Sequence, residues 1–562
     1  MFLEQVYKVY VVDRPGQGRN PYQPFVNGNF DAQAPTFDRA VRTAKGTAAH
    51  TQWPGPCDAN DPAIVQLAAS FGQPMAPSAV TQGIWRSRGA MLLEEIGPAM
   101  FVTHLDGAGL AWAVAQDKPD LVKGVVAVEP NTQPPTIAGV PLAIVTAEAS
   151  SNPAQAGSAD AIRLGALGIR GNGPLLIHEK NNREALAPVL AWLARHEPAM
   201  QAAAPDPHPN KDNTSLKLAE QGCFFIGVQR KKMQYGEIPL GQMAVQYMIP
   251  ADRKHRYPVV MTHGGGGQGT HMMGIGGRPG WVHYFVQNGY AVYWIDRPSY
   301  GRSPYHPDSL GPSHLPNVPA YEGLIGSTAV FNTAQWPGPG GMNDPIIGQF
   351  MACESGNTAD EAFHSSLAWP GGAELLDKIG PAILMTHSQS GTFHWPIADA
   401  RPNLVKAIVA VEPNGPPVFE TEFKGAPEWF ADMGGKKSSG LGEVPLTYDP
   451  PVKPGEELAF VKQDKPDAPD LVRCWKQAEP ARKLPKLANI PILIVVAEAS
   501  YHASYDHCTA NYLTQAGVRN TMIRLESRGI RGNGHMMMLE KNSDHIAALM
   551  LEWIEKTVPP KP

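Results

Sequence analysis

The chain has 562 residues, enough for several compact domains at roughly 150 residues per domain. Its 47 basic and 52 acidic side chains give a net charge of −5 without a run of like charge, which disfavours a nucleic-acid or membrane partner. Five widely spaced cysteines without a CxxC pair indicate neither a zinc ribbon nor a disulfide framework. Because the N-terminus also lacks the pattern of a secretory signal, we expect a cytoplasmic protein.

The sequence contains an imperfect internal repeat. The motif QWPGP at residues 52–56 recurs at 335–339, an offset of 283, and other matches share this offset. The residues AEAS at 147–150 recur at 497–500, an offset of 350, and GNG at 171–173 recurs at 532–534, an offset of 361. These matches predict a tandem duplication whose second copy carries insertions.

A Pro-, Ala- and Asp-rich stretch separates the two copies and is typical of a linker. We therefore predict a first domain over residues 1–196, a linker over 197–214 and a second domain over 215–562. We expect the two copies to pack on each other, and a homo-oligomer is compatible with the sequence.

Short apolar runs predict the strands. In the first copy, a strand is expected immediately before Asp13. In the second copy, strands are expected at Gln242–Met248, Pro258–Thr262, Ala291–Ile295, Ile383–Thr386, Ala407–Val411, Ile492–Val496 and Thr521–Leu525. Near-continuous apolar runs of this length are typical of parallel strands covered on both faces. The predicted fold class is therefore α/β, with a mostly parallel sheet flanked by helices.

Three segments of the second copy carry groups suited to acyl transfer. A glycine cluster follows the strand that ends at Thr262, and its backbone N–H groups suit a developing oxyanion. Ser388 stands in a small-residue turn between an apolar strand and a helix, as in a nucleophile elbow, although G-x-S-x-G is not met. His535 lies in a glycine-rich loop after the last strand, where a base is expected.

A carboxylate must orient the imidazole of such a base. Glu412 and Glu498 both stand at strand ends. Both recur in the first copy, as Glu129 and Glu148, so the internal comparison leaves the choice open.

Five motifs of the second copy together point to a family: residues 215–227, Thr262-His-Gly, His387–Gly391, Val411–Pro413 and Gly534–Met538. The second copy resembles an unusual bacterial serine esterase of the α/β-hydrolase superfamily, whose oxyanion loop carries a disulfide between adjacent cysteines. This resemblance implies a nucleophile, a base and an acid at Ser388, His535 and Glu412, with Glu498 as the alternative acid. It also implies an oxyanion hole formed by the N–H groups of Gly265 and Gln389. Glycines replace the two cysteines here, at 265 and 266.

The first copy lacks two of these groups. At the matching offsets, Leu105 replaces Ser388 and Pro174 replaces His535, whereas Glu129 remains. The first copy also has no counterpart of residues 215 to about 284, which include the glycine cluster. We predict a degenerate domain without catalytic activity.

The second copy carries a long insertion over residues 416–485, rich in aromatic residues: Phe419, Phe423, Trp429, Phe430, Phe460 and Trp475. We predict a lid that supplies an apolar acyl pocket. The segment His502–Cys508 matches no standard metal-ligand spacing, so we predict neither a metal nor a cofactor.

These features together predict a serine hydrolase that cleaves a carboxylic ester or lactone through an acyl-enzyme on Ser388. The alternatives are a thioesterase or acyltransferase with the same triad, and a non-catalytic binding scaffold. The expected partner is a small-molecule ester or lactone.

Overall fold

A computed structural model describes residues 2–558 except 6, 24–26, 32–33, 77, 151–156, 158, 198–214, 315–333, 341–342, 359–360 and 424–429. The chain forms two units: Met1–Pro209 with Arg230–Pro239, and Asn210–Gln229 with Leu240–Pro562. The segment Arg230–Pro239 contains most of a hairpin, β6 (Gln229–Met233) and β7 (Gly236–Leu240). Beyond Glu197, the predicted linker lies outside the described residues.

The second unit is built on an eight-stranded sheet with the order β20-β19-β14-β13-β9-β10-β8-β5. Its strands are β5 (Leu218–Ile226), β8 (Met243–Pro250), β9 (Val259–Thr262), β10 (Val292–Asp296), β13 (Ala382–His387), β14 (Val405–Val411), β19 (Ile492–Val496) and β20 (Asn520–Arg524). In this sheet only β8 runs antiparallel to its neighbours. The predicted α/β class, with a mostly parallel sheet, is confirmed.

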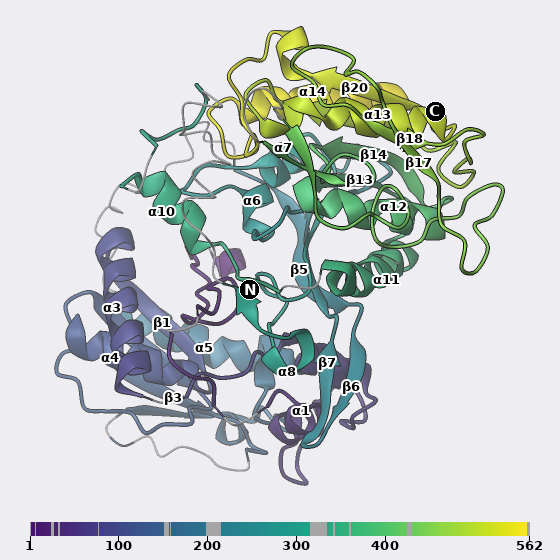
Figure 1. Cartoon of the computed structure of the whole chain (residues 1–562). Coiled ribbons are helices and arrows are strands. Elements are labelled where there is room, and N and C mark those ends of the chain that lie inside the picture. Colours follow the sequence, from purple (N-terminus) through teal and green to yellow (C-terminus); the bar gives the residue numbers. More distant parts are fainter. Residues whose placement is uncertain are drawn as a thin grey trace. The chain divides into compact units, whose positions relative to one another are not determined.

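Helices cover both faces of this sheet, as Figure 1 shows. One face packs against α7 (Trp281–Gln287) and α14 (Ser543–Thr557), which lie side by side, and against α10 (Pro345–Ala352). The other face packs against α11 (Glu361–Ile379), α12 (Gly391–Ala400) and α13 (Asp506–Gln515). The central strands β9, β13, β14 and β19 are buried on both sides, which explains why their sequences are almost continuously apolar. Two short helices, α6 (Thr270–Met273) and α8 (Pro307–Leu310), complete the unit.

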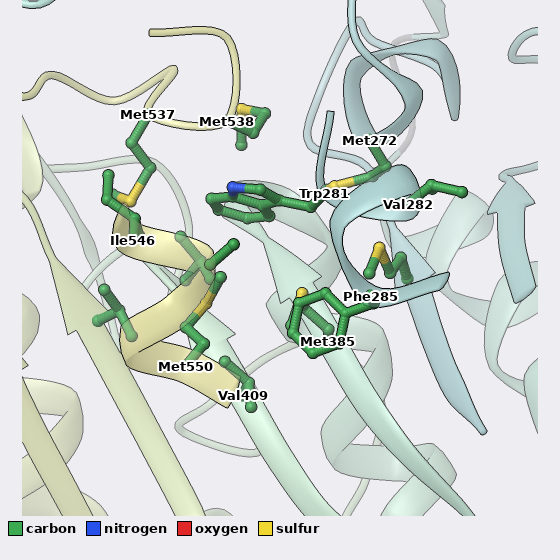
Figure 2. Packing of buried hydrophobic residues seen from close by; sticks show 14 of the residues in the cluster. Met272, Trp281, Val282, Phe285, Met385, Val409, Met537, Met538, Ile546 and Met550 are labelled. Atoms are coloured by element: carbon green, nitrogen blue, oxygen red, sulfur yellow. The ribbon is translucent and has the colours of Figure 1, made fainter. Parts of the chain in front are cut away.

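The core on the α7 and α14 face is rich in methionine and aromatic side chains, which pack among aliphatic residues. Figure 2 shows side chains from α7, from α14 and from the sheet pointing toward one another: Trp281, Phe285, Ile546, Met550, Met385 and Val409. Met536–Met538 are buried in the same cluster. Burying each such side chain contributes roughly 1.5–3 kcal/mol, so this packing fixes the loop that carries His535.

The first unit contains a smaller parallel sheet with the order β1-β2-β3-β4. Its strands are β1 (Ala99–His104), β2 (Val122–Val128), β3 (Leu142–Thr146) and β4 (Asp160–Arg163). Helices α3 (Ala79–Ile96) and α4 (Gly107–Asp117) pack on one face, and α5 (Asn182–His196) packs on the other. The remaining helices are α1 (Phe37–Ala44) and α2 (Pro62–Ser70).

The predicted strand before Asp13 is wrong. Residues 7–14 form no strand, and Val9, Val11 and Val12 are exposed. At an offset of 283 their counterpart is β10, which pairs with β8 and β9 on its two sides. Among the described residues of the first unit, no strand pairs with residues 7–14, and an extended segment without hydrogen-bonding partners does not form a strand.

The insertion of the second copy forms two small hairpins: β15 (Glu420–Phe423) with β16 (Phe430–Met433), and β17 (Phe460–Lys462) with β18 (Trp475–Gln477). The ring centroids of Phe419 and Trp475 lie 5.1 Å apart. Trp429 and the side chain of Phe423 lie outside the described residues. A disulfide joins Cys474 to Cys508, a pairing that the sequence did not indicate. Among the described residues, no helix combines the length and apolarity needed to cross a bilayer.

Candidate active site

Ser388 occupies the turn between β13 and α12. Its φ is +53°, a left-handed conformation that is uncommon for a residue with a side chain and that projects this side chain out of the turn. The hydroxyl of Ser390 accepts the N–H of His387 at 3.0 Å and donates to the Thr262 carbonyl at 3.0 Å. A Cβ on Gly391 would lie 2.7 Å from the Pro413 Cβ, so the turn requires glycine there.

The glycine loop after β9 runs beside this turn. A Cβ built on Gly264 would lie 2.9 Å from the Cβ of Ser388, and one on Gly265 would lie 3.1 Å from Gln389 Oε1. The structure therefore brings both predicted oxyanion donors, Gly265 and Gln389, next to Ser388. A residue larger than glycine at 264 would collide with the serine.

Buried polar contacts hold the glycine loop in place. Arg297, itself buried, donates from Nη2 to the Gly264 carbonyl at 2.7 Å. The Ser355 N–H donates to the Gly266 carbonyl at 2.7 Å. These bonds satisfy backbone acceptors of the loop and reduce its freedom, which matters because an oxyanion hole works only when its donors are preorganised.

His535 and Glu412 form a short buried pair. His535 Nδ1 lies 2.6 Å from Glu412 Oε2, and both side chains are almost completely buried. The Glu412 carboxylate also accepts the Ala497 N–H at 2.8 Å and the Ser500 hydroxyl at 2.7 Å. With its proton on Nδ1, His535 leaves Nε2 free to accept a proton from another group.

Burial disfavours charge on both members of this pair. It lowers the pKa of His535 well below its usual value, and the neighbouring His502 lowers that pKa further. Burial raises the pKa of Glu412 to about 7. The imidazole is therefore neutral near pH 7, which is the protonation state that a general base requires.

Glu498, the alternative acid, does not meet His535. Its carboxylate accepts Arg531 Nη1 at 2.8 Å and the Gly532 N–H at 3.1 Å, and it is partly exposed. Of the two candidates, the structure brings only Glu412 into contact with the imidazole.

Two site residues were missed from the sequence, His502 and Tyr501. The imidazole of His502 stacks on that of His535 with centroids 4.8 Å apart and planes 6° apart. The Tyr501 hydroxyl lies 3.4 Å from His535 Nε2. Both residues begin the 3-10 helix η5 (Tyr501–Ser504), within the part of the second copy that the first copy lacks. Both residues follow a strand end and lie close to Glu498 in the sequence, and this position was the feature from which they could have been predicted.

The insertion also reaches the neighbourhood of Ser388. The Asn414 N–H donates to the Ser388 carbonyl at 2.9 Å, and Asn414 Nδ2 donates to Glu420 Oε1 at 3.3 Å. Lys437, which is buried, pairs with Glu420 at 2.6 Å. The start of the insertion is thus fixed to the turn that carries the serine.

Three groups among the described residues bring potential metal ligands together: Cys474, His507 and Cys508; His271, Cys353 and Glu354; and Glu412, His502 and His535. The first contains the disulfide, and the third contains the pair just described. In the second, His271 Nε2 lies 2.9 Å from Glu354 Oε1. Each group thus has partners within the protein, and the expectation of no metal remains a prediction.

No protein-family model matches the chain. The chain is 39% identical over 320 residues to the probable secreted lipase phiG of a fungus (strain ATCC 74256), and this match covers 56% of the chain and 85% of that lipase. The chain belongs to the family of this lipase. It is therefore a carboxylic-ester hydrolase of the α/β-hydrolase type.

Two solved structures show weaker likeness. A bacterial esterase has a TM-score of 0.41 and 22% identity, covering 62% of this chain and 99% of its own. The naproxen esterase of Bacillus subtilis has a TM-score of 0.28 and 11% identity, covering 60% of this chain and 92% of its own.

The expected cytoplasmic localisation is contradicted, because the 39% identical relative is named a secreted protein. The cysteine count was a poor guide here. An odd number of dispersed cysteines does not exclude one disulfide, and Cys474 and Cys508 are brought together only by the fold.

Proposed function

We propose that Ser388, His535 and Glu412 form a catalytic triad that hydrolyses a carboxylic ester or lactone through an acyl-enzyme on Ser388. The observation that carries this proposal is the 2.6 Å contact of a buried carboxylate with His535, beside a serine on a left-handed turn. The nucleophile follows β13, the orienting acid follows β14, and the base lies in the loop after β20. This is the division of roles that a serine hydrolase requires.

In the acylation half-reaction, His535 Nε2 takes the proton of Ser388 Oγ as the oxygen attacks the ester carbonyl carbon. Glu412 holds the imidazole in the Nδ1–H tautomer and stabilises the imidazolium that forms. The carbonyl π electrons move to the oxygen, which becomes an oxyanion. When the intermediate collapses, His535 returns the proton to the departing alcohol oxygen, and water later releases the acid in the same way.

The N–H groups of Gly265 and Gln389 are the proposed donors to the oxyanion. Their support is the proximity of both residues to Ser388 and the bonds that fix the glycine loop. In the resemblance noted above, adjacent cysteines rigidify this loop. Here the buried Arg297 contributes a corresponding restraint through the Gly264 carbonyl.

For the chain as a whole, we propose the organisation expected from the repeat: a degenerate domain at 1–196, a catalytic domain at 215–562 and a lid at 416–485. We further propose that the protein acts outside the cell on esters with apolar acyl groups. The support is the name of its relative, a secreted lipase, together with a disulfide, which persists in oxidising compartments.

The test is labelling with a fluorophosphonate probe, with the modified peptide read by mass spectrometry. We expect modification at Ser388, its loss in Ser388→Ala and in His535→Ala, and much slower labelling in Glu412→Gln. The matched control is Glu498→Gln, which should label at the wild-type rate. An unlabelled wild-type protein would overturn the proposal, and slow labelling in Glu498→Gln alone would transfer the role of the acid to Glu498.

A further inference from the structure

Tyr501 contacts both reacting side chains of the proposed triad. Its hydroxyl lies 3.4 Å from His535 Nε2 and next to the side chain of Ser388. Its ring centroid lies 4.9 Å from that of His535. In the proposed acylation step, the serine proton moves from Ser388 Oγ to His535 Nε2. The Tyr501 hydroxyl therefore lies beside the two atoms that exchange this proton.

The protein holds Tyr501 in this position from two sides. On one side, the preceding Ser500 is bound to the Glu412 carboxylate at 2.7 Å. On the other side, the Tyr501 ring packs against a small apolar cluster formed by Val472, Cys474, Tyr505 and Cys508. Since two of these residues belong to the insertion, the insertion itself positions Tyr501.

The disulfide strengthens this second support. Cys474 precedes β18 of the insertion and Cys508 lies in α13, two elements that lie side by side (Figure 1). The Val472 N–H also donates to the Ser504 carbonyl, at the end of η5, at 3.0 Å. The hydroxyl of Tyr501 is thus presented by a fixed segment, not by a loose loop.

We propose that Tyr501 is a further catalytic residue, which donates a hydrogen bond to the leaving-group oxygen as the tetrahedral intermediate collapses. This inference rests on the proposed function. In that step the bond from carbon to the leaving oxygen breaks, its electron pair goes to that oxygen, and His535 Nε2 delivers its proton there. The leaving oxygen must come within reach of Nε2, next to the Tyr501 hydroxyl, which keeps its own proton.

The protonation state of Tyr501 agrees with a donor. Burial raises its pKa above the usual value, and the nearby Glu412 raises it further, so the phenol remains neutral over the working pH range. A neutral phenol offers one hydrogen to an oxygen that gains negative charge. Such a bond strengthens as the charge develops, which is the condition for accelerating the step.

The test compares Tyr501→Phe with wild type on esters that share one acyl group but differ in the acidity of the alcohol. An alkyl alcohol is a poor leaving group and needs help, whereas p-nitrophenol departs without it. We expect kcat/KM of the variant to fall about 10- to 100-fold for the ethyl ester and to change little for the p-nitrophenyl ester. The dependence of log kcat/KM on leaving-group pKa therefore becomes steeper.

The control variant is Tyr512→Phe, a buried tyrosine of α13 whose hydroxyl lies 2.9 Å from that of Tyr448. It should show the wild-type dependence. An equal loss for all esters, or no loss, in Tyr501→Phe would overturn the role of Tyr501. Retained p-nitrophenyl esterase activity shows that the variant folds. Fluorophosphonate labelling of Ser388 separates the two proposals, because the proposed function fails only if the wild-type serine stays unlabelled.

Discussion

The two units share the backbone at the carboxyl ends of their sheets but differ in the side chains that stand on it. Leu105 after β1 has a φ of +49°, and Ser388 after β13 has a φ of +53°. Glu129 after β2 and Glu412 after β14 have φ values of +48° and +44°. The first unit, which has leucine at this position, thus forms the same kind of turn as the one that carries Ser388.

The carboxylates of the two units also keep the same protein partners. Glu129 accepts the Ala147 N–H and the Ser150 hydroxyl, each at 2.6 Å. Glu412 accepts the equivalent groups of Ala497 and Ser500. Only Glu412 has an imidazole as a further partner, since the position of His535 is Pro174 in the first unit.

This difference shows which residues of the site have a structural role. A buried N–H at a strand end requires an acceptor whether or not the unit is catalytic, so the glutamate has a structural role in both units. The serine and the histidine satisfy no such requirement. A carboxylate at this position is therefore weak support for activity, whereas the imidazole and the hydroxyl are strong support.

The largest expected effect comes from exchanging nucleophiles between the units. Ser388→Ala should lower kcat/KM by about 10⁴-fold or more, as loss of a triad serine does. Adding Leu105→Ser and Pro174→His to that variant should restore nothing, because the described residues of the first unit contain no glycine cluster like that at 264–267. Ester hydrolysis assays on purified chains measure both. Recovered turnover would show that the first unit retains a usable site.

The two glutamates should respond very differently to the same change. We expect Glu412→Gln to lower kcat by about 10²- to 10⁴-fold, because an amide facing Nδ1 favours the wrong tautomer of His535. Glu129→Gln should leave kcat at the wild-type value. Thermal unfolding of both variants serves as the control for folding. Similar losses of activity in the two would mean that the first unit takes part in catalysis.

The fall of kcat/KM at low pH, the acid limb of the pH profile, depends on the pKa of His535 and therefore on its surroundings. Hydrolysis requires the neutral imidazole, and His502 lowers the pKa of His535, so His502 keeps the base unprotonated to lower pH. In His502→Gln the acid limb of kcat/KM should therefore move to higher pH. His545→Gln, at an exposed position of α14, is the control and should leave the limb in place. A limb that moves to lower pH would contradict the assigned influence of His502.

The smallest expected effect concerns backbone strain at Leu105. A leucine in the left-handed region costs about 1–2 kcal/mol, whereas asparagine tolerates this region. Leu105→Asn should therefore raise the free energy of unfolding by about 1 kcal/mol or less without affecting kcat. Denaturant unfolding of the whole chain measures the change. A destabilised variant would indicate that the half-buried leucine side chain contributes more than the strain costs.

Much of the second unit could be predicted from its sequence because buried parallel strands leave a direct signal. All seven strands expected there were found, and the central ones, β9, β13, β14 and β19, are short apolar runs covered on both faces. The edge strand β5 was missed because its sequence, Leu218–Ile226, mixes apolar and polar residues on a half-exposed edge. The strand expected before Asp13 has the same apolar character as β10 but lacks neighbours. The amino-acid composition of a segment does not show whether neighbouring strands are present to pair with it.

By itself, the sequence determined the fold class, the positions of Ser388, His535 and Glu412 on it, and the replacement of the serine and the histidine by Leu105 and Pro174 in the first copy. These are properties of local patterns: a buried run, a tight turn and a residue at a fixed offset. Only the tertiary structure decided between Glu412 and Glu498, joined Cys474 to Cys508 and brought Tyr501 to Ser388. The physical reason is that these contacts link residues far apart in the chain, whose distance depends on how strands and insertion pack rather than on any local preference.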